Sequence, residues 1–169
     1  MDRWLSHPSS ARAVNAFSLE FVVRYMRDAA HLFGNDYDCA MIFLAVLEGN
    51  GRLNIRDPSF ARDYSDARVS LPVETVRPMS RQAIAESLGM PRETVRRKIA
   101  ALIERKFLIE DPRGGVITAR DVIGRPEFLA AQARVVNYLR QLRADLRSYA
   151  GAPDEQWPLL TEKRTDLTV

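Results

Sequence analysis

The chain has 169 residues, of which 46% are hydrophobic and 28% charged, and its formal net charge is +3. This length is sufficient for one domain with a full hydrophobic core, and the single cysteine, Cys39, excludes an intramolecular disulfide. The most apolar segment, residues 40–47, is too short to span a membrane, and the polar residues that follow Met1 do not resemble a secretory leader. We therefore expect a cytoplasmic protein with no cofactor and no membrane partner.

The first half of the chain is predicted to be helical, followed by an irregular insertion. We expect a flexible lead-in over residues 1–17 and a helical core or dimerisation part over residues 18–50. Ser18 is the expected N-cap of a helix with Leu19 and Val22 on its inner face, and Asp36 or Asp38 caps a second helix over residues 39–48, which residues 49–51 stop. Residues 51–78 contain three prolines and no sustained period, which predicts an irregular insertion of unassigned role.

Residues 79–120 have the pattern of a winged helix-turn-helix. Ser80 is the expected N-cap of the first helix, Gly89 provides the left-handed residue that ends it, and Pro91 begins the second helix. Apolar residues recur at helical spacing on both inner faces. Residues 107–110 and 116–118 are predicted strands, and the turn between them carries Arg113 at its tip, where it would be free to touch the DNA backbone.

The start of the second helix has the composition of a recognition helix. Arg92, Glu93, Arg96 and Arg97 are expected on its outer face, where arginine can donate to guanine O6 and N7 and a carboxylate can accept from cytosine N4. Residues 80–120 carry 9 basic and 5 acidic side chains, whereas residues 1–79 carry 9 and 10. This bias predicts a phosphate-facing surface, to which we expect Arg96, Lys98 and Arg113 to contribute backbone contacts. A solvated charged face is the alternative.

The C-terminal part, residues 121–150, is predicted to be one long dimerisation helix, followed by a poorly ordered tail over residues 151–169. From Val135 onward its apolar residues are spaced alternately by four and three, as in a heptad seam. We expect this seam to join two copies of the chain; packing of the helix on its own domain is the alternative. The seam residues are Val135, Leu139, Leu142, Leu146 and Tyr149.

The run from Ser80 to Leu102 resembles the DNA-binding domain of the cyclic-AMP receptor protein family of bacterial regulators. The resemblance lies in Ser-Arg-Gln-Ala-Ile-Ala at 80–85, Leu-Gly at 88–89 and Arg-Glu-Thr-Val at 92–95, followed by Arg97, Ile99 and Leu102. It implies base contacts from Arg92, Glu93 and Arg97. It also implies phosphate contacts from Ser80, Gln82 and Thr94.

The resemblance covers about a quarter of the chain and does not extend to a sensor domain. The 79 residues ahead of it lack the glycine-spaced strands of a cyclic-nucleotide domain, and Met90–Pro91 replaces the usual polar cap. The layout of helices around a winged helix is similar to that of the multiple-antibiotic-resistance repressor group, in which terminal helices of two chains form the dimer. This second likeness concerns architecture alone.

These observations predict a mainly α-helical protein with a small β-hairpin wing and flanking N- and C-terminal dimerisation helices. We expect it to bind double-stranded DNA as a homodimer and to regulate transcription. A winged-helix module that binds protein is the alternative. No nucleophile elbow or phosphate-binding glycine loop indicates an enzyme, no sequence feature identifies a small-molecule effector, and His31, Asp36, Asp38 and Cys39 match no strong metal-ligand spacing.

Overall fold

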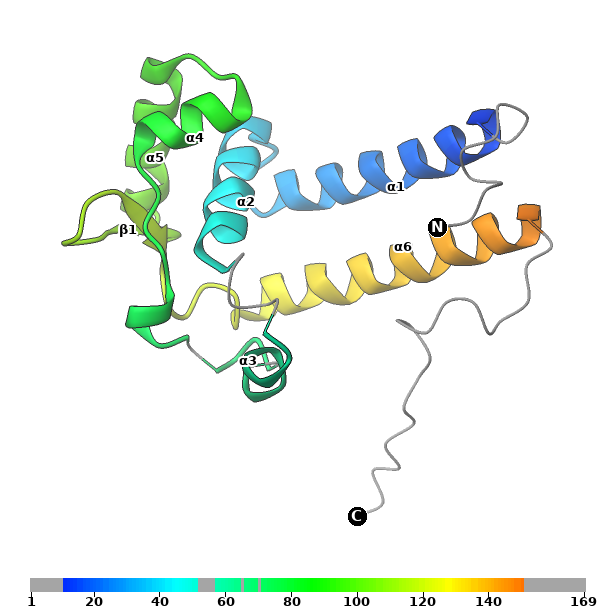
Figure 1. The fold of residues 1–169 in the computed structure, drawn as a ribbon. Coiled ribbons are helices and arrows are strands. Elements are labelled where there is room, and N and C mark those ends of the chain that lie inside the picture. The colour runs from blue at the N-terminus through cyan, green and yellow to red at the C-terminus, as the bar shows by residue number, and fades with distance from the viewer. Residues whose placement is uncertain (1–10, 52–56, 65, 70, 151–169) are drawn as a thin grey trace. The chain divides into compact units, whose positions relative to one another are not determined.

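The computed structural model describes residues 11–51, 57–64, 66–69 and 71–150. The described chain is mainly helical, with one two-stranded antiparallel sheet (Figure 1). It divides into two compact units: residues 26–133, and a smaller unit that combines residues up to Tyr25 with those from Arg134 onward. The elements are, in order, α1 (Ala11–His31), α2 (Tyr37–Gly51), α3 (Pro58–Asp63), the short 3₁₀ helix η1 (Val73–Thr75), α4 (Arg81–Leu88), α5 (Arg92–Glu104), β1 (Leu108–Glu110), β2 (Val116–Thr118) and α6 (Pro126–Ala150).

The larger unit is built around α2, which contacts α4, α5 and β2. Its fully buried side chains include Ile42 and Val46 of α2, Ile84 of α4 and Ile99 of α5. An aromatic cluster closes the base of this core, with the rings of Phe33 and Phe107 4.9 Å apart and those of Phe43 and Phe128 5.4 Å apart. The almost wholly apolar character of α2, noted in the sequence, follows from its contacts on several sides.

The hairpin formed by β1 and β2 pairs Ile109 with Ile117, and Met79 extends it through an isolated bridge to Val116. The residue that precedes the N-cap of α4 therefore lies beside the wing. Phe107 and Leu108 are buried at the start of the hairpin, which attaches the wing to the core.

The smaller unit contains the N-terminal part of α1 and the C-terminal part of α6, which lie side by side (Figure 1). Phe17 and Phe21 of α1 and Leu142 of α6 line one shallow depression, and the guanidinium of Arg24 lies 5.9 Å from the ring centroid of Tyr138. The flanking helices thus pack together through aromatic and aliphatic side chains.

Helix α1 corrects two sequence expectations. It begins at Ala11 and not at an N-cap on Ser18, because residues 11–17 contain no glycine or proline and Phe17 packs toward α6. The predicted inner face is buried at Ala29 and Phe33, but Leu19 and Val22 are 53% and 48% exposed.

Helix α2 extends to Gly51, whereas the sequence predicted that it ends at Glu48 and is stopped by residues 49–51. Asn50 is buried, and its side chain donates to the Arg77 carbonyl at 2.6 Å and accepts from the Thr118 backbone N–H at 2.9 Å. These contacts stabilise the last turn despite the two glycines. The helix begins at Tyr37, two residues before the predicted start, and of the two predicted caps Asp36 is used, since its carboxylate accepts from the Cys39 backbone N–H at 3.0 Å.

Candidate nucleic-acid interface

Two local signals position the second helix of the helix-turn-helix. The Ser80 side chain accepts a hydrogen bond from the Ala83 backbone N–H at 3.1 Å and caps α4. Gly89 has φ +62° and its N–H bonds to the carbonyls of Ala85 and Glu86, which ends α4 and turns the chain sharply. Because most side chains are strained at this φ, glycine is the favoured residue for the turn. Both features were predicted from the sequence.

The inner faces of α4 and α5 fix the orientation of α5 against the core. Ile84 and Ala85 of α4 are buried, as are Val95, Ile99 and Leu102 of α5. The sequence predicted that Pro91 is the first residue of the second helix, but in the structure it is the N-cap. It makes no side-chain cap, and its carbonyl accepts from the Val95 N–H at 3.1 Å. The helix therefore begins at Arg92.

The outer face at the start of α5 presents charged groups to solvent. Arg92, Glu93, Arg96 and Arg97 are all exposed, as predicted. Arg96 donates to both carboxylate oxygens of Glu93, at 2.9 and 2.6 Å, and this hydrogen-bonded pairing lowers the pKa of Glu93. Glu93 therefore presents a carboxylate that can accept from a base edge, beside guanidinium groups that can donate to one.

The three residues assigned to phosphates by resemblance lie near this face. Ser80 and Gln82 are exposed and Thr94 is half-buried. The Gln82 side-chain amide donates to Glu86 at 2.8 Å, and Arg92 lies 3.8 Å from the same carboxylate. The start of α4 and the start of α5 thus share one polar surface.

Lys98 does not lie on this outer surface, contrary to its predicted role. Its ammonium is 2.5 Å from Asp36 Oδ2 and 3.9 Å from Asp38 Oδ2, and its side chain is only 18% exposed. The hydrogen bond to Asp36 raises the pKa of Lys98. The position is three residues after Val95 and four before Leu102, so helical spacing already placed it on the inner stripe; its charge obscured that signal.

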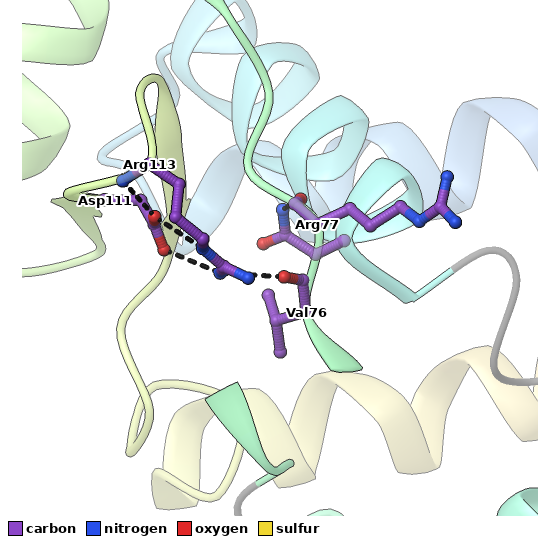
Figure 2. A network of polar contacts seen from close by, with 5 residues as sticks. Val76, Arg77, Asp111 and Arg113 are labelled. Atoms are coloured by element: carbon purple, nitrogen blue, oxygen red, sulfur yellow. Dashed lines mark hydrogen bonds and ion pairs between the residues drawn. The ribbon is translucent and has the colours of Figure 1, made fainter. Parts of the chain in front are cut away.

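The sequence predicted that Arg113 is free at the wing tip, but its side chain makes hydrogen bonds within the chain. Figure 2 shows its guanidinium directed back onto Asp111 and the Val76 carbonyl. The Asp111 side chain is 1% exposed, and Arg113 lowers its pKa to about 2 by hydrogen bonding. Next to Asp111 in the sequence, Glu110 of β1 pairs with Arg81 of α4. The wing is therefore joined to α4 by one ion pair, Arg81–Glu110, and to the segment before α4 by the hydrogen bond from Arg113 to the Val76 carbonyl.

The predicted seam residues of α6 do not share one environment. Leu142 faces Phe17 and Phe21 of the same chain, whereas Leu139 is exposed. Val135 and Leu146 are half-buried, and the side chain of Tyr149 lies outside the described residues. Part of the heptad is thus used within the chain, as in the alternative considered from the sequence.

Three polar residues that organise this region were not identified from the sequence: Asp36 as the partner of Lys98, Asn50 as the link to β2, and Asp111 as the partner of Arg113. Only Asp111 had a local signal, because it stands two residues before Arg113 in a turn. Within the described ranges, no set of three or more His, Cys, Asp or Glu side chains is arranged to hold a metal, and no helix has the length and apolar character that a membrane crossing requires.

Residues 78–108 match the family model of bacterial regulatory proteins, crp family. These residues cover the end of the segment leading into α4, both helices and the beginning of β1. The chain thus carries a Crp-family helix-turn-helix DNA-binding motif within a small helical protein with a hairpin wing. The motif indicates a DNA-binding transcription regulator and not a catalyst. No curated protein and no solved structure matches the chain significantly.

Proposed function

We propose that this protein is a sequence-specific, duplex-DNA-binding transcription regulator that acts as a cytoplasmic homodimer. The observation that carries the proposal is the exposed start of α5, where Arg92, Glu93 and Arg97 project from a helix fixed by the Gly89 turn and a buried inner face. In this arrangement α5 enters the major groove, and its first two turns meet the base edges.

Base reading is assigned to Arg92, Glu93 and Arg97. Arginine donates two parallel hydrogen bonds to guanine, and the Glu93 carboxylate, held by Arg96, accepts from cytosine. Ser80, Gln82, Thr94 and Arg96 lie beside these residues and are assigned to the phosphates. Lys98 and Arg113 are left out of this set, because each is paired with an aspartate that is half-buried or buried, whereas the carboxylate partner of Arg96 is exposed.

The first test measures duplex binding by fluorescence anisotropy, with a target selected from random duplex DNA. Arg92→Ala and Arg97→Ala should each weaken binding to that target by about 1–3 kcal/mol, which is about 5- to 150-fold, and relax the choice of base at one position. Arg12→Ala, which removes an exposed arginine of α1, is the matched control and should leave binding unchanged.

A salt series on the wild-type protein separates DNA binding from the alternative of a protein-interaction module. For a DNA-binding protein, the logarithm of the binding constant falls linearly with the logarithm of the salt concentration, with a slope of about −0.9 for each phosphate neutralised. Unchanged binding in both arginine variants would remove these residues as readers, and the absence of any duplex binding would leave the interaction module as the better assignment.

The homodimer is proposed from the apolar surface of the smaller unit. Leu19, Val22 and Val23 of α1 and Val136 and Leu139 of α6 are exposed, although their spacing is that of a buried helix face. We assign this surface to the same unit of a second copy. A two-fold pair of this kind would also present two recognition helices to two half-sites.

The second test measures the mass in solution at micromolar concentration by light scattering. The wild type should have twice the chain mass, and Leu139→Asp should shift the mass to that of one chain, because a buried unpaired carboxylate is strongly unfavourable. Asn137→Asp, at an exposed polar position of the same helix, is the control and should remain dimeric. A wild-type protein with the mass of one chain would contradict the homodimer.

A further inference from the structure

We propose that Arg113 is a positioning residue that fastens the wing to the segment leading into α4, and that it does not bind a DNA phosphate. This goes beyond the proposed function and depends on it in one respect only, the effect of Arg113 on duplex binding. Val76, Asp111 and Arg113 lie together in Figure 2, and Met79 and Gly115 adjoin them through the backbone of the same two segments.

The guanidinium of Arg113 is engaged on two of its edges. Nε donates to Asp111 Oδ1 at 2.8 Å, and Nη2 donates both to Asp111 Oδ2 at 2.8 Å and to the Val76 carbonyl at 2.9 Å. The Arg113 backbone N–H also donates to Asp111 Oδ1 at 2.8 Å. One side chain therefore connects the wing turn to a segment 37 residues earlier in the chain.

The turn that carries Arg113 is itself held against the same segment. The Cβ of any residue replacing Gly115, which has φ +92°, would lie 2.4 Å from the Met79 carbonyl oxygen, so only glycine fits there. Met79 and Val116 exchange backbone hydrogen bonds of 3.0 and 2.9 Å. Arg113 adds a second attachment three residues before the first, at Val76.

The alternative, in which Arg113 moves outward to a phosphate, is disfavoured because it would leave the Asp111 carboxylate without its cation. The Asp111 carboxylate is 1% exposed, and a buried carboxylate that loses its cation is strongly destabilising. Hydrogen bonding to Arg113 lowers the pKa of Asp111 to about 2, so the pairing stabilises the ionised form of the carboxyl. Phosphate contact would therefore have to compensate for an unpaired buried charge.

Arginine is required here because of its shape. A planar guanidinium can donate to both oxygens of a carboxylate and still reach a carbonyl, whereas the ammonium of lysine acts as a point charge. A phosphate, in contrast, accepts lysine almost as well as arginine. The lysine variant therefore distinguishes a positioning role from a phosphate contact.

The test compares Arg113→Gln, Arg113→Lys and Asp111→Asn with the wild type in the absence of DNA. In all three variants, amide hydrogen exchange at Met79 and Val116 should be about tenfold faster or more, because these amides pair across the fastened edge. The Ile99 amide in α5 should change by less than about twofold. In Arg113→Gln and Arg113→Lys the pKa of the Asp111 carboxyl, followed by NMR, should rise toward its ordinary value.

Arg77→Gln is the matched control, since the Arg77 side chain extends away from Asp111 and Arg113 in Figure 2. Exchange at Met79 and Val116 should remain at the wild-type rate in this variant. Circular dichroism on each variant verifies that the protein is folded under the conditions of measurement.

Duplex binding distinguishes the two roles, because each predicts a different effect of Asp111→Asn on affinity. If Arg113 positions the wing, Asp111→Asn weakens binding by about the same factor as Arg113→Gln, and the glutamine and lysine variants share one salt slope. If Arg113 binds a phosphate, Asp111→Asn binds equally well or more tightly, and only the glutamine variant loses about one unit of slope. That second pattern, or unchanged amide exchange in Arg113→Gln, overturns the proposal. A wild-type protein that bound no duplex would refute the proposed function without altering the exchange result.

Discussion

The two units of the chain differ in how completely their apolar side chains are buried. In residues 26–133, side chains such as Ile42, Ile84 and Ile99 are completely buried, and an aromatic cluster closes the core. In the smaller unit, Val23 is 65% exposed and Leu139 is 38% exposed. The larger unit therefore derives its stability from its own residues, whereas the smaller one retains apolar surface that burial would stabilise by about 25 cal/mol for each Å².

Among the variants that test this difference in burial, Phe43→Ala is expected to have the largest effect on the free energy of unfolding. Phe43 is buried, with its ring 5.2 Å from that of Phe33 and 5.4 Å from that of Phe128. Its removal leaves a cavity in the aromatic cluster and should lower the free energy of unfolding by about 3–5 kcal/mol. Urea denaturation followed by circular dichroism measures this loss, and a loss below about 1 kcal/mol would show that the larger unit is not stabilised by this cluster.

A smaller effect is expected from Lys98→Met, which removes the ion pair between α5 and the turn before α2. The Asp36 carboxylate, half-buried, would lose its strongest partner, and the free energy of unfolding should fall by about 1–3 kcal/mol. Lys106→Met, at an exposed position just after α5, is the control and should change it by less than about 0.5 kcal/mol. Equal losses in the two variants would mean that the pair contributes nothing.

The smallest effect is expected from Val23→Ala in the smaller unit. Measured at a concentration where the chain is monomeric, this variant should alter the free energy of unfolding by less than about 0.5 kcal/mol. The same change at Val46, which is fully buried in α2, should cost about 2 kcal/mol. Similar losses of unfolding free energy at both positions would contradict the difference between the units, because Val23 would then be buried in the monomer.

The features predicted well from the sequence are those fixed by neighbouring residues. The Ser80 cap, the Gly89 turn and the short strands of the wing each depend on a residue type at a defined place in a local pattern. The exposed face of α5 was predicted equally well, because helical periodicity separates Val95 and Ile99 from Arg92 and Arg97. The match of residues 78–108 to the family model covers this same stretch.

The features predicted poorly are those decided by contacts between distant parts of the chain. Lys98 can keep its charge on the inner stripe because Asp36, 62 residues earlier, accepts from it. Helix α2 continues through two glycines because Asn50 reaches Arg77 and Thr118. The insertion over residues 51–78 gave no periodic signal, yet its end meets Asn50 and Arg113 by hydrogen bonds. A single sequence does not show which distant partners such polar groups will find.

The bridge between Met79 and Val116 limits how the DNA-binding part can be cut out of the chain. A fragment trimmed to begin at Ser80, the cap of α4, would lose Met79, which bridges to β2, and would expose that backbone edge of the wing to unwanted pairing. Retaining residues from Val76 onward would keep that edge covered, but the buried side of α5 would still lack α2. The smallest piece that folds alone should therefore include α2, even though the family match begins only at residue 78.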